Sequence, residues 1–273
     1  MGVDLDQFQR RPRDPGAATG RDTRVVAHRG ASDEHPEHTL AAYEQAIADG
    51  ADALECDVRL TRDARLVCVH DRRVNRTSDG RGAVSALTLD ELDRLDFGSW
   101  KGGGAEPARV LAFDELLNLA TSAPRPVELA VETKHPTRWA GRVEHELVRQ
   151  LRLFGLHRPK PGEPPRVRLM SFSRLALRRL RALAPELPLV HLTERPPLPG
   201  RPPALPTGVR IAGPGIDLVR ARPDLVPRLR AAGHQVHVWT VDEPEDVELC
   251  LRLGVHTLIT NRPRQVLEQI GDR

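Results

Sequence analysis

Ionisable side chains end four short apolar runs of the sequence, and their types and spacing suit acid/base chemistry beside a metal ion. The first run ends in His28, the second in Glu55 and Asp57, the third in His70 and the fourth in Glu132. Short apolar runs of this kind are typical of buried strands. Carboxylates and imidazoles at the ends of consecutive strands contribute little to a core, but they are common in catalytic sites.

The acidic residues predict a site for a divalent cation. Glu55 and Asp57 are two residues apart on one expected strand, so their side chains point to the same face. Two buried carboxylates repel each other unless a cation lies between them. Oxygen ligands favour Mg²⁺ or Ca²⁺, with Mn²⁺ also possible, and Glu132 would complete three protein ligands. The alternative is a surface pair on a hairpin that forms ion pairs with Arg24 or Arg59.

The two histidines are candidates for proton transfer, because imidazole gains or loses a proton near neutral pH. On opposite sides of a scissile bond, His28 and His70 would supply a general base and a general acid. A single histidine at a strand end is more often a structural residue. Two of them beside the acidic pair favour catalysis.

Three further residues are candidates for binding the substrate. Arg29 precedes the small residue Gly30, and its planar guanidinium suits bidentate recognition of phosphate. Lys134 lies two residues after Glu132 and adds a point charge on the same face. Both cations would also pair with the acids of the metal site, which is compatible with phosphate binding. Trp239, at a later strand end, forms either an apolar wall for a small substrate or ordinary barrel packing.

The composition argues against nucleic acid and membranes as partners. The 273 residues include 41 basic and 38 acidic side chains, and the net charge of +3 is too small to predict nucleic-acid binding. The N-terminus lacks the apolar core of a signal peptide, and no segment approaches the ~20 apolar residues that span a bilayer. We therefore expect no stable membrane anchor. The three cysteines lie in apolar patterns, which predicts buried thiols and a cytoplasmic location. The oligomeric state stays open.

The order of apolar runs and helical patterns predicts an α/β barrel. Residues 1–22 are rich in Gly, Pro and charge and predict a flexible tail, followed by a single barrel domain over 23–273. The expected strands cover 24–28, 52–58, 66–70, 127–132, 167–172, 187–192, 216–219, 235–241 and 257–260. The expected helices cover 39–49, 88–95, 113–121, 139–154, 175–183, 223–232, 245–253 and a final segment.

Nine strands are one too many for an eight-stranded barrel. About seven residues separate the second and third strands, which is too few for a parallel crossover of at least ~10–12 residues. We predict that these two strands form a hairpin that turns near Asp63 and places Asp57 opposite His70. Eight strands then remain. The predicted fold is a (β/α)₈ TIM barrel with a β-hairpin insertion after the second strand.

The sequence over 28–71 resembles the signature of the glycerophosphodiester phosphodiesterases. In that family a His-Arg-Gly element, a Pro-Glu-Asn-Thr element, a Glu-x-Asp strand and a His-Asp pair follow one another in this order. The resemblance covers nearly all of residues 24–267 and continues through five further segments: Arg76-Thr77, Glu132-x-Lys134, Ser171-Phe172, Trp239-Thr240-Val241 and Thr260-Asn261-Arg262-Pro263.

The resemblance implies a (β/α)₈ barrel and metal-dependent hydrolysis of glycerophosphodiesters to sn-glycerol 3-phosphate and an alcohol. The nucleophile would be either the glycerol 2-hydroxyl, which gives a cyclic phosphate, or water. Residue by residue, it implies acid/base roles for His28 and His70, metal ligation by Glu55, Asp57 and Glu132, and phosphate binding by Arg29 and Lys134.

Four positions depart from the family pattern. His38 stands where the family usually has Asn, and we expect it to change how the His28 loop is held. Asp242 replaces the usual Asn, Asn261 replaces an Asp often found before the final proline, and Ala64 replaces a common Gly of the hairpin. None removes a catalytic side chain, so we expect activity.

Two other functions fit the same residues. A lysophospholipase D or sphingomyelinase D-like enzyme would act on lipids and would need an apolar lip around the site. With nine aromatic residues and a loop rich in proline and arginine over 195–207, we expect no strong lip. A non-catalytic barrel that binds glycerol phosphate is the other alternative. Two histidines beside the acids argue against it, because binding alone needs neither a proton donor nor a proton acceptor.

Overall fold

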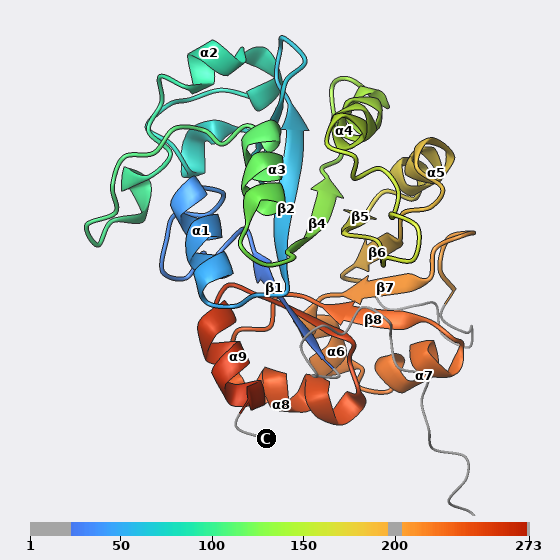
Figure 1. The fold of residues 1–273 in the computed structure, drawn as a ribbon. Coiled ribbons are helices and arrows are strands. Elements are labelled where there is room, and N and C mark those ends of the chain that lie inside the picture. The colour runs from blue at the N-terminus through green and yellow to red at the C-terminus, as the bar shows by residue number, and fades with distance from the viewer. Residues whose placement is uncertain (1–22, 196–203, 272–273) are drawn as a thin grey trace, which may run out of the picture.

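Eight parallel strands close into a barrel in the computed structural model, which describes residues 23–195 and 204–271 (Figure 1). Around the ring they are β1 (Arg24–His28), β2 (Ala53–Leu60), β4 (Glu128–Thr133), β5 (Val167–Ser171), β6 (Leu189–Thr193), β7 (Ile211–Pro214), β8 (Gln235–Val238) and β9 (Thr257–Thr260). Val26 of β1 pairs with Ala53 of β2 on one side and with Ile259 of β9 on the other, which closes the ring. The predicted (β/α)₈ barrel is confirmed.

The predicted hairpin is also present, but its register differs from the prediction by one residue. The strand β3 (Leu66–Cys68) runs antiparallel to β2 and pairs Leu66 with Leu60. A turn that is symmetric about Asp63 therefore places Val69 opposite Asp57, and the Val69 amide donates to the Asp57 carbonyl. His70 follows after the paired residues end, where the Arg59 guanidinium donates to its carbonyl.

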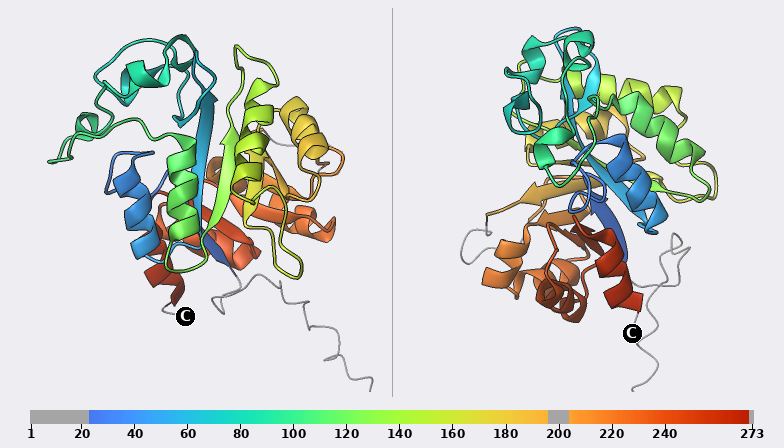
Figure 2. Two further views of the ribbon diagram at one scale, coloured as in Figure 1. Left: turned by 45° about the horizontal axis from the view of Figure 1, so that its top comes forward. Right: turned by 90° about the vertical axis from the view of Figure 1, so that its left-hand side faces the viewer.

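Helices stand on the outside of the strands in every view (Figures 1 and 2). They are α1 (Leu40–Ala48), α3 (Phe113–Ser122), α4 (Arg142–Leu153), α5 (Arg174–Leu183), α6 (Ile216–Ala221), α7 (Leu225–Ala231), α8 (Pro244–Leu253) and α9 (Pro263–Gly271). Between β3 and α3 the chain makes an excursion at the upper left of Figure 1, with α2 (Leu89–Leu92) and the short turns Val74–Arg76, Val84–Ala86 and Ser99–Lys101. Thr88 and Glu91 form the expected capping box of α2, but the helix ends at Leu92 and not at residue 95.

The predicted strand over 216–219 is wrong, because this segment is helix α6 and the seventh barrel strand is β7. The sequence of β7 contains a glycine and a proline, which are typical of turns, so no strand was predicted there. Gly213 is needed for packing, since a Cβ there would lie 2.7 Å from the Leu192 side chain of β6. The apolar residues that suggested a strand, Ile216, Leu218 and Val219, are the buried residues of α6.

Side-chain alternation along the strands positions the polar residues inside the barrel. In β2, Leu54, Cys56 and Val58 belong to the apolar cluster between the strands and the outer helices. The residues between them, Glu55 and Asp57, therefore face the barrel interior. All three cysteines are free and buried, as expected. The expected tail over 1–22 and residues 196–203 of the loop lie outside the described residues, and no described helix is long and apolar enough to cross a membrane.

Candidate active site

A cavity of about 280 Å³ opens at the carboxyl ends of the strands. Its lining contains seven of the eight residues predicted for the site, all except Asp57. These are His28, Arg29, Glu55, His70, Glu132, Lys134 and Trp239. Five lining residues were not predicted as site residues: Met170, Phe172, Leu192, Glu194 and Ile259.

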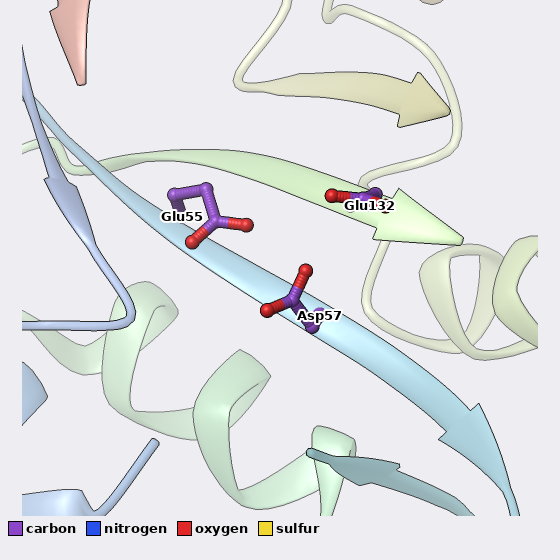
Figure 3. Close-up of side chains that lie close together, drawn as sticks. All are labelled: Glu55, Asp57 and Glu132. Carbon is purple, nitrogen blue, oxygen red and sulfur yellow. The ribbon is translucent and has the colours of Figure 1, made fainter. Parts of the chain in front are cut away.

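The predicted carboxylates form a compact buried cluster (Figure 3). Each of Glu55, Asp57 and Glu132 offers an oxygen atom, and these atoms all lie within 4.8 Å of one another. The β2–β4 register explains the proximity, because Asp57 pairs directly with Glu132 across the two strands. All three side chains are buried, so the predicted surface alternative for this pair does not apply.

The two predicted phosphate-binding cations lie against these acids. Lys134 Nζ is 3.0 Å from Asp57 Oδ1 and 2.9 Å from Glu132 Oε2. Arg29 Nε is 3.2 Å from Asp57 Oδ2, and the Arg29 backbone N–H donates to Glu55 Oε2. Gly30 has a positive φ and packs against the Ala42 backbone, so its close approach is to helix α1.

Burial and mutual repulsion divide the three carboxyls into different charge states. Burial opposes ionisation of Asp57, but the Lys134 charge and the hydrogen bond from His38 outweigh it and hold the Asp57 pKa well below its usual range. Burial and the Asp57 charge raise the pKa of Glu132 to about 8 and that of Glu55 well above its usual range. Without a cation, Asp57 is ionised and Glu132 is mainly protonated at neutral pH.

The donor set fits a hard divalent cation. Glu55 Oε1 makes no hydrogen bond within residues 23–195 and 204–271, and both Glu55 and Glu132 line the cavity. A cation between these carboxyls would favour their ionised forms, because it opposes the burial and the repulsion that raise their pKa values. Oxygen-only ligation favours Mg²⁺, Ca²⁺ or Mn²⁺.

The hydrogen bonds of His28 specify its tautomer. The Asn261 amide Nδ2–H donates to Asp242 Oδ2 at 2.6 Å, which turns the amide oxygen of Asn261 towards His28. This oxygen is 2.7 Å from His28 Nδ1 and also accepts from the Ser32 hydroxyl. Since an amide oxygen only accepts, Nδ1 carries the proton and Nε2 keeps a free lone pair. Burial, followed by the charge of Arg29, lowers the pKa of His28 to about 3.

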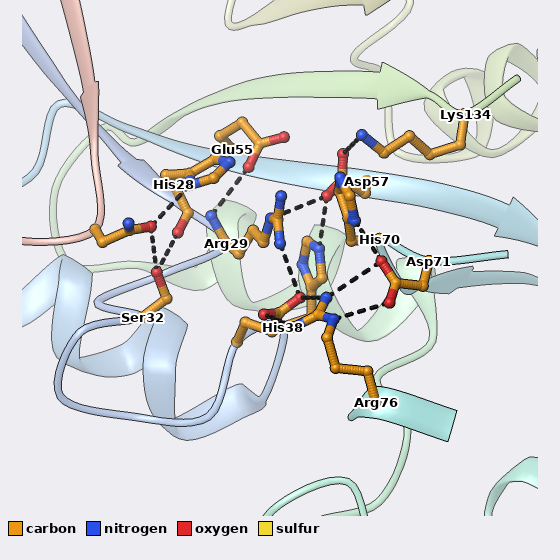
Figure 4. A network of polar contacts seen from close by, with 12 residues as sticks. His28, Arg29, Ser32, His38, Glu55, Asp57, His70, Asp71, Arg76 and Lys134 are labelled. Atoms are coloured by element: carbon orange, nitrogen blue, oxygen red, sulfur yellow. Dashed lines mark hydrogen bonds and ion pairs between the residues drawn. The ribbon is translucent and has the colours of Figure 1, made fainter. Parts of the chain in front are cut away.

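His70 has a carboxylate partner in place of an amide (Figure 4). Its Nδ1–H donates to Asp71 Oδ1 at 2.7 Å. Hydrogen bonds from Arg76 lower the Asp71 pKa to about 2, so this carboxyl is ionised. Arg76 also pairs with Glu37, which in turn holds the Arg29 guanidinium. Burial lowers the pKa of His70, and the charges of Lys134 and Arg29 add to that shift. The Asp57 charge and the hydrogen bond to Asp71 oppose it.

The side chain of His38 contacts Asp57, whereas we had expected an effect on the His28 loop. His38 Nε2–H donates to Asp57 Oδ2 at 3.0 Å, and Nδ1 is 2.8 Å from the Tyr43 hydroxyl. The loop is held through the backbone, since the His38 amide donates to the Arg29 carbonyl. The φ of +60° at His38 is a conformation in which Asn and His are enriched, which fits the Asn usual at this position in the family that the sequence resembles.

An apolar wall closes the other side of the cavity. Trp239 and Phe172 form an edge-to-face pair with ring centroids 5.5 Å apart. Trp239 also donates from Nε1 to the Gly213 carbonyl of β7, so both predicted roles, cavity wall and barrel packing, apply to it. Glu194 was missed, although it directly follows β6. It lies between the expected strand over 187–192 and the expected proline-rich loop over 195–207.

Asp242 and Asn261 form one contact, and exchanging them tests the state of His28. In the double variant Asp242→Asn/Asn261→Asp a carboxylate would lie beside His28 Nδ1 and raise its pKa by roughly 1–3 units. A base works only when neutral, so activity is lost as the pH falls through this pKa. We expect the acidic limb of the kcat profile at saturating metal to move to higher pH in the double variant. The single variant Asp242→Asn keeps an amide at both positions and should leave the limb in place. Coincident profiles for all three proteins would contradict this account of His28.

Comparisons with known proteins agree with one another. The model of a family described as the glycerophosphoryl diester phosphodiesterase family matches residues 28–265. A Mycobacterium tuberculosis protein named probable glycerophosphodiester phosphodiesterase 1 is 45% identical over 253 residues, which cover 91% of this chain and 92% of that one. The glycerophosphodiester phosphodiesterase of Bacillus subtilis is 34% identical over 249 residues, 88% of this chain and 83% of that one.

A solved structure shares the fold. It is an Oleispira antarctica phosphodiesterase in complex with the product sn-glycerol-3-phosphate, with a TM-score of 0.79, 25% identity, and coverage of 91% of this chain and 96% of that chain. The segment matched by the family model begins at His28 and ends after Ile259, so it includes every residue that lines the cavity.

Proposed function

This chain belongs to the glycerophosphoryl diester phosphodiesterase family and is a phosphoric diester hydrolase, and we propose that it hydrolyses glycerophosphodiesters to sn-glycerol 3-phosphate and an alcohol with a divalent cation and two histidines. One observation carries the proposal: three buried carboxylates, two histidines and the side chains of Arg29 and Lys134 lie together at one cavity. The proposal includes the expected organisation, a tail over 1–22 and one barrel domain over 23–273.

Glu55, Asp57 and Glu132 would hold the cation. When bound, a divalent cation supplies charge neutralisation and polarises an oxygen of the phosphate or of a glycerol hydroxyl. The hydrogen bond from His38 Nε2 to Asp57 Oδ2 holds the Asp57 carboxylate in one orientation. This ligand set would serve Mg²⁺, Ca²⁺ or Mn²⁺.

Arg29 and Lys134 would bind the phosphate. Both line the cavity, and Arg29 Nη2 has no hydrogen bond within the described residues, so it is available to a phosphate oxygen. Glu37 and Asp57 hold the remaining guanidinium nitrogens, which orients the side chain before a substrate arrives. Fixed cations of this kind stabilise the charge that develops on the phosphoryl oxygens in the transition state.

The two histidines have different hydrogen-bond partners, and this difference supports different roles for them in the proposed reaction. His28 is neutral, with Nε2 unprotonated, so it would accept the proton of the attacking hydroxyl or water. The pKa of His70 is also lowered by burial, but the hydrogen bond to the ionised Asp71 opposes that shift. Of the two histidines, His70 is therefore the one that would donate a proton from Nε2 to the leaving alcohol oxygen. One P–O bond forms to the nucleophile and the P–O bond to the alcohol breaks. If the nucleophile is the glycerol hydroxyl, water then opens the cyclic phosphate to give sn-glycerol 3-phosphate. Environments that push two pKa values apart commonly mark acid and base.

The direct test is release of sn-glycerol 3-phosphate from glycerophosphocholine and glycerophosphoethanolamine by the purified protein. We expect release that EDTA abolishes and that Mg²⁺, Ca²⁺ or Mn²⁺ restores, because the cation would neutralise charge on the phosphate and polarise an oxygen of the substrate. Release that is insensitive to EDTA would leave the hydrolytic activity standing and reject the cation site. Absence of release with every metal would reject the proposed substrates and direct attention to lipid phosphodiesters or to a binding role.

A further inference from the structure

One acidic residue stands apart from the carboxylate cluster inside the cavity. Glu194 follows β6, which is four strands away from β1 in either direction around the ring. It lines the cavity together with Phe172 and Trp239, and its side chain is exposed. In the part of the chain that the structure describes, Glu194 forms no ion pair and no side-chain hydrogen bond. Its charge is therefore available to a ligand.

The cavity is electrostatically divided. The ionisable residues of the proposed catalytic machinery come from β1, β2, β4 and the segment after β3. The other half of the ring contributes apolar side chains, which are Met170, Phe172, Leu192, Trp239 and Ile259. Among the described lining residues of that half, Glu194 carries the only charge. A ligand that spans the cavity therefore meets cations and acids at one end, and an aromatic wall with a single carboxylate at the other.

We propose that Glu194 and the aromatic pair Phe172–Trp239 form a subsite for the alcohol group of the substrate, and that the subsite favours alcohols that carry an ammonium or quaternary ammonium group. The inference rests on the proposed function, since Arg29 and Lys134 have to hold the phosphate for the alcohol to reach this side. A carboxylate attracts the positive charge, and aromatic faces bind quaternary ammonium groups.

Two arginines lie near this subsite. Arg174 and Arg195 line an adjoining hollow together with Glu194, but among the described residues neither forms an ion pair with Glu194. Because Glu194 is exposed, water screens its attraction for a ligand, and the expected discrimination is modest. An exposed ion pair together with one cation–π contact corresponds to about fivefold to tenfold in kcat/KM.

The test compares kcat/KM for glycerophosphocholine and for glycerophosphoglycerol, whose alcohol group is uncharged, in the wild-type protein and two variants. Glu194→Gln removes the ion pair and keeps the aromatic pair, so it should lower the choline-to-glycerol ratio about twofold to fivefold. The loss should come mainly through KM for glycerophosphocholine, because the charge acts on bound substrate and transition state alike. Glu186→Gln makes the same change on an exposed residue before β6, at the opposite end of the strand, and should keep the wild-type ratio.

High salt gives a second readout, because it screens the Glu194 charge. The ratio of the wild-type protein should fall towards that of Glu194→Gln as salt is added, while the ratio of the variant stays constant. An unchanged ratio in Glu194→Gln, or an equal loss on both diesters, would overturn the inference and leave the proposed function intact. Absence of turnover of both diesters by the wild-type protein would overturn the proposed function and this inference together.

Discussion

Replacement of His70 by alanine is expected to lower kcat for glycerophosphocholine by roughly 10²–10⁴-fold, because choline leaves as an alkoxide unless a general acid protonates it. Replacement of His28 by alanine is expected to cause a loss of similar size through the missing general base. The two variants are therefore indistinguishable on glycerophosphocholine. A substrate whose leaving group needs no proton separates them.

The p-nitrophenyl ester of glycerol phosphate provides that separation. Its phenolate leaves without protonation, so His70→Ala should recover most of the lost activity on this ester, while His28→Ala should stay impaired. His145→Ala changes an exposed histidine of α4 and serves as the matched control. The opposite pattern would exchange the two assigned roles, and near-normal turnover of glycerophosphocholine by His70→Ala would reject the two-histidine mechanism.

The sequence predicted the barrel because its evidence was local and periodic. Short apolar runs that alternate with amphipathic segments specify strands and helices, and the short link between the second and third strands specified the hairpin. Alternation within one strand also placed Glu55 and Asp57 on the same face, inside the barrel. The strand β7 was not predicted, because it contains Gly213. Packing against Leu192 requires a glycine at this position, but in a sequence a glycine usually indicates a turn.

The partners of the site residues were beyond sequence reasoning because they lie far apart in the chain. His28 and Asn261 are separated by 233 positions, and their contact depends on the closure of the ring between β1 and β9. The sequence presented Asp242 and Asn261 as two unrelated departures from the family pattern. In the fold they touch, and an acid and an amide have exchanged places within one contact, so that an amide oxygen now faces the imidazole.

Replacement of Glu132 by glutamine is expected to lower kcat/KM by roughly 10²–10⁴-fold, the equivalent of several kcal/mol of charge stabilisation by a bound cation. The same variant should fold as well as the wild-type protein in EDTA. Burial and the Asp57 charge raise the pKa of Glu132 to about 8, so the cation-free protein holds this carboxyl mainly in the protonated form. Glutamine has the shape and neutrality of that form, and its amide oxygen can still accept from Lys134.

Thermal unfolding distinguishes a role of Glu132 in cation binding from a role in the stability of the fold. Added Mg²⁺, Ca²⁺ or Mn²⁺ should raise the Tm of the wild-type protein, because a ligand of the native state stabilises it in proportion to the logarithm of its concentration over Kd. The rise should be much smaller in Glu132→Gln, whereas Glu186→Gln should behave as the wild-type protein does. A Tm in EDTA that falls well below the wild-type value would make Glu132 a structural residue. An equal metal-dependent rise in both proteins would mean that the cation binds elsewhere, since a site built from these three carboxylates cannot lose one of them without losing affinity.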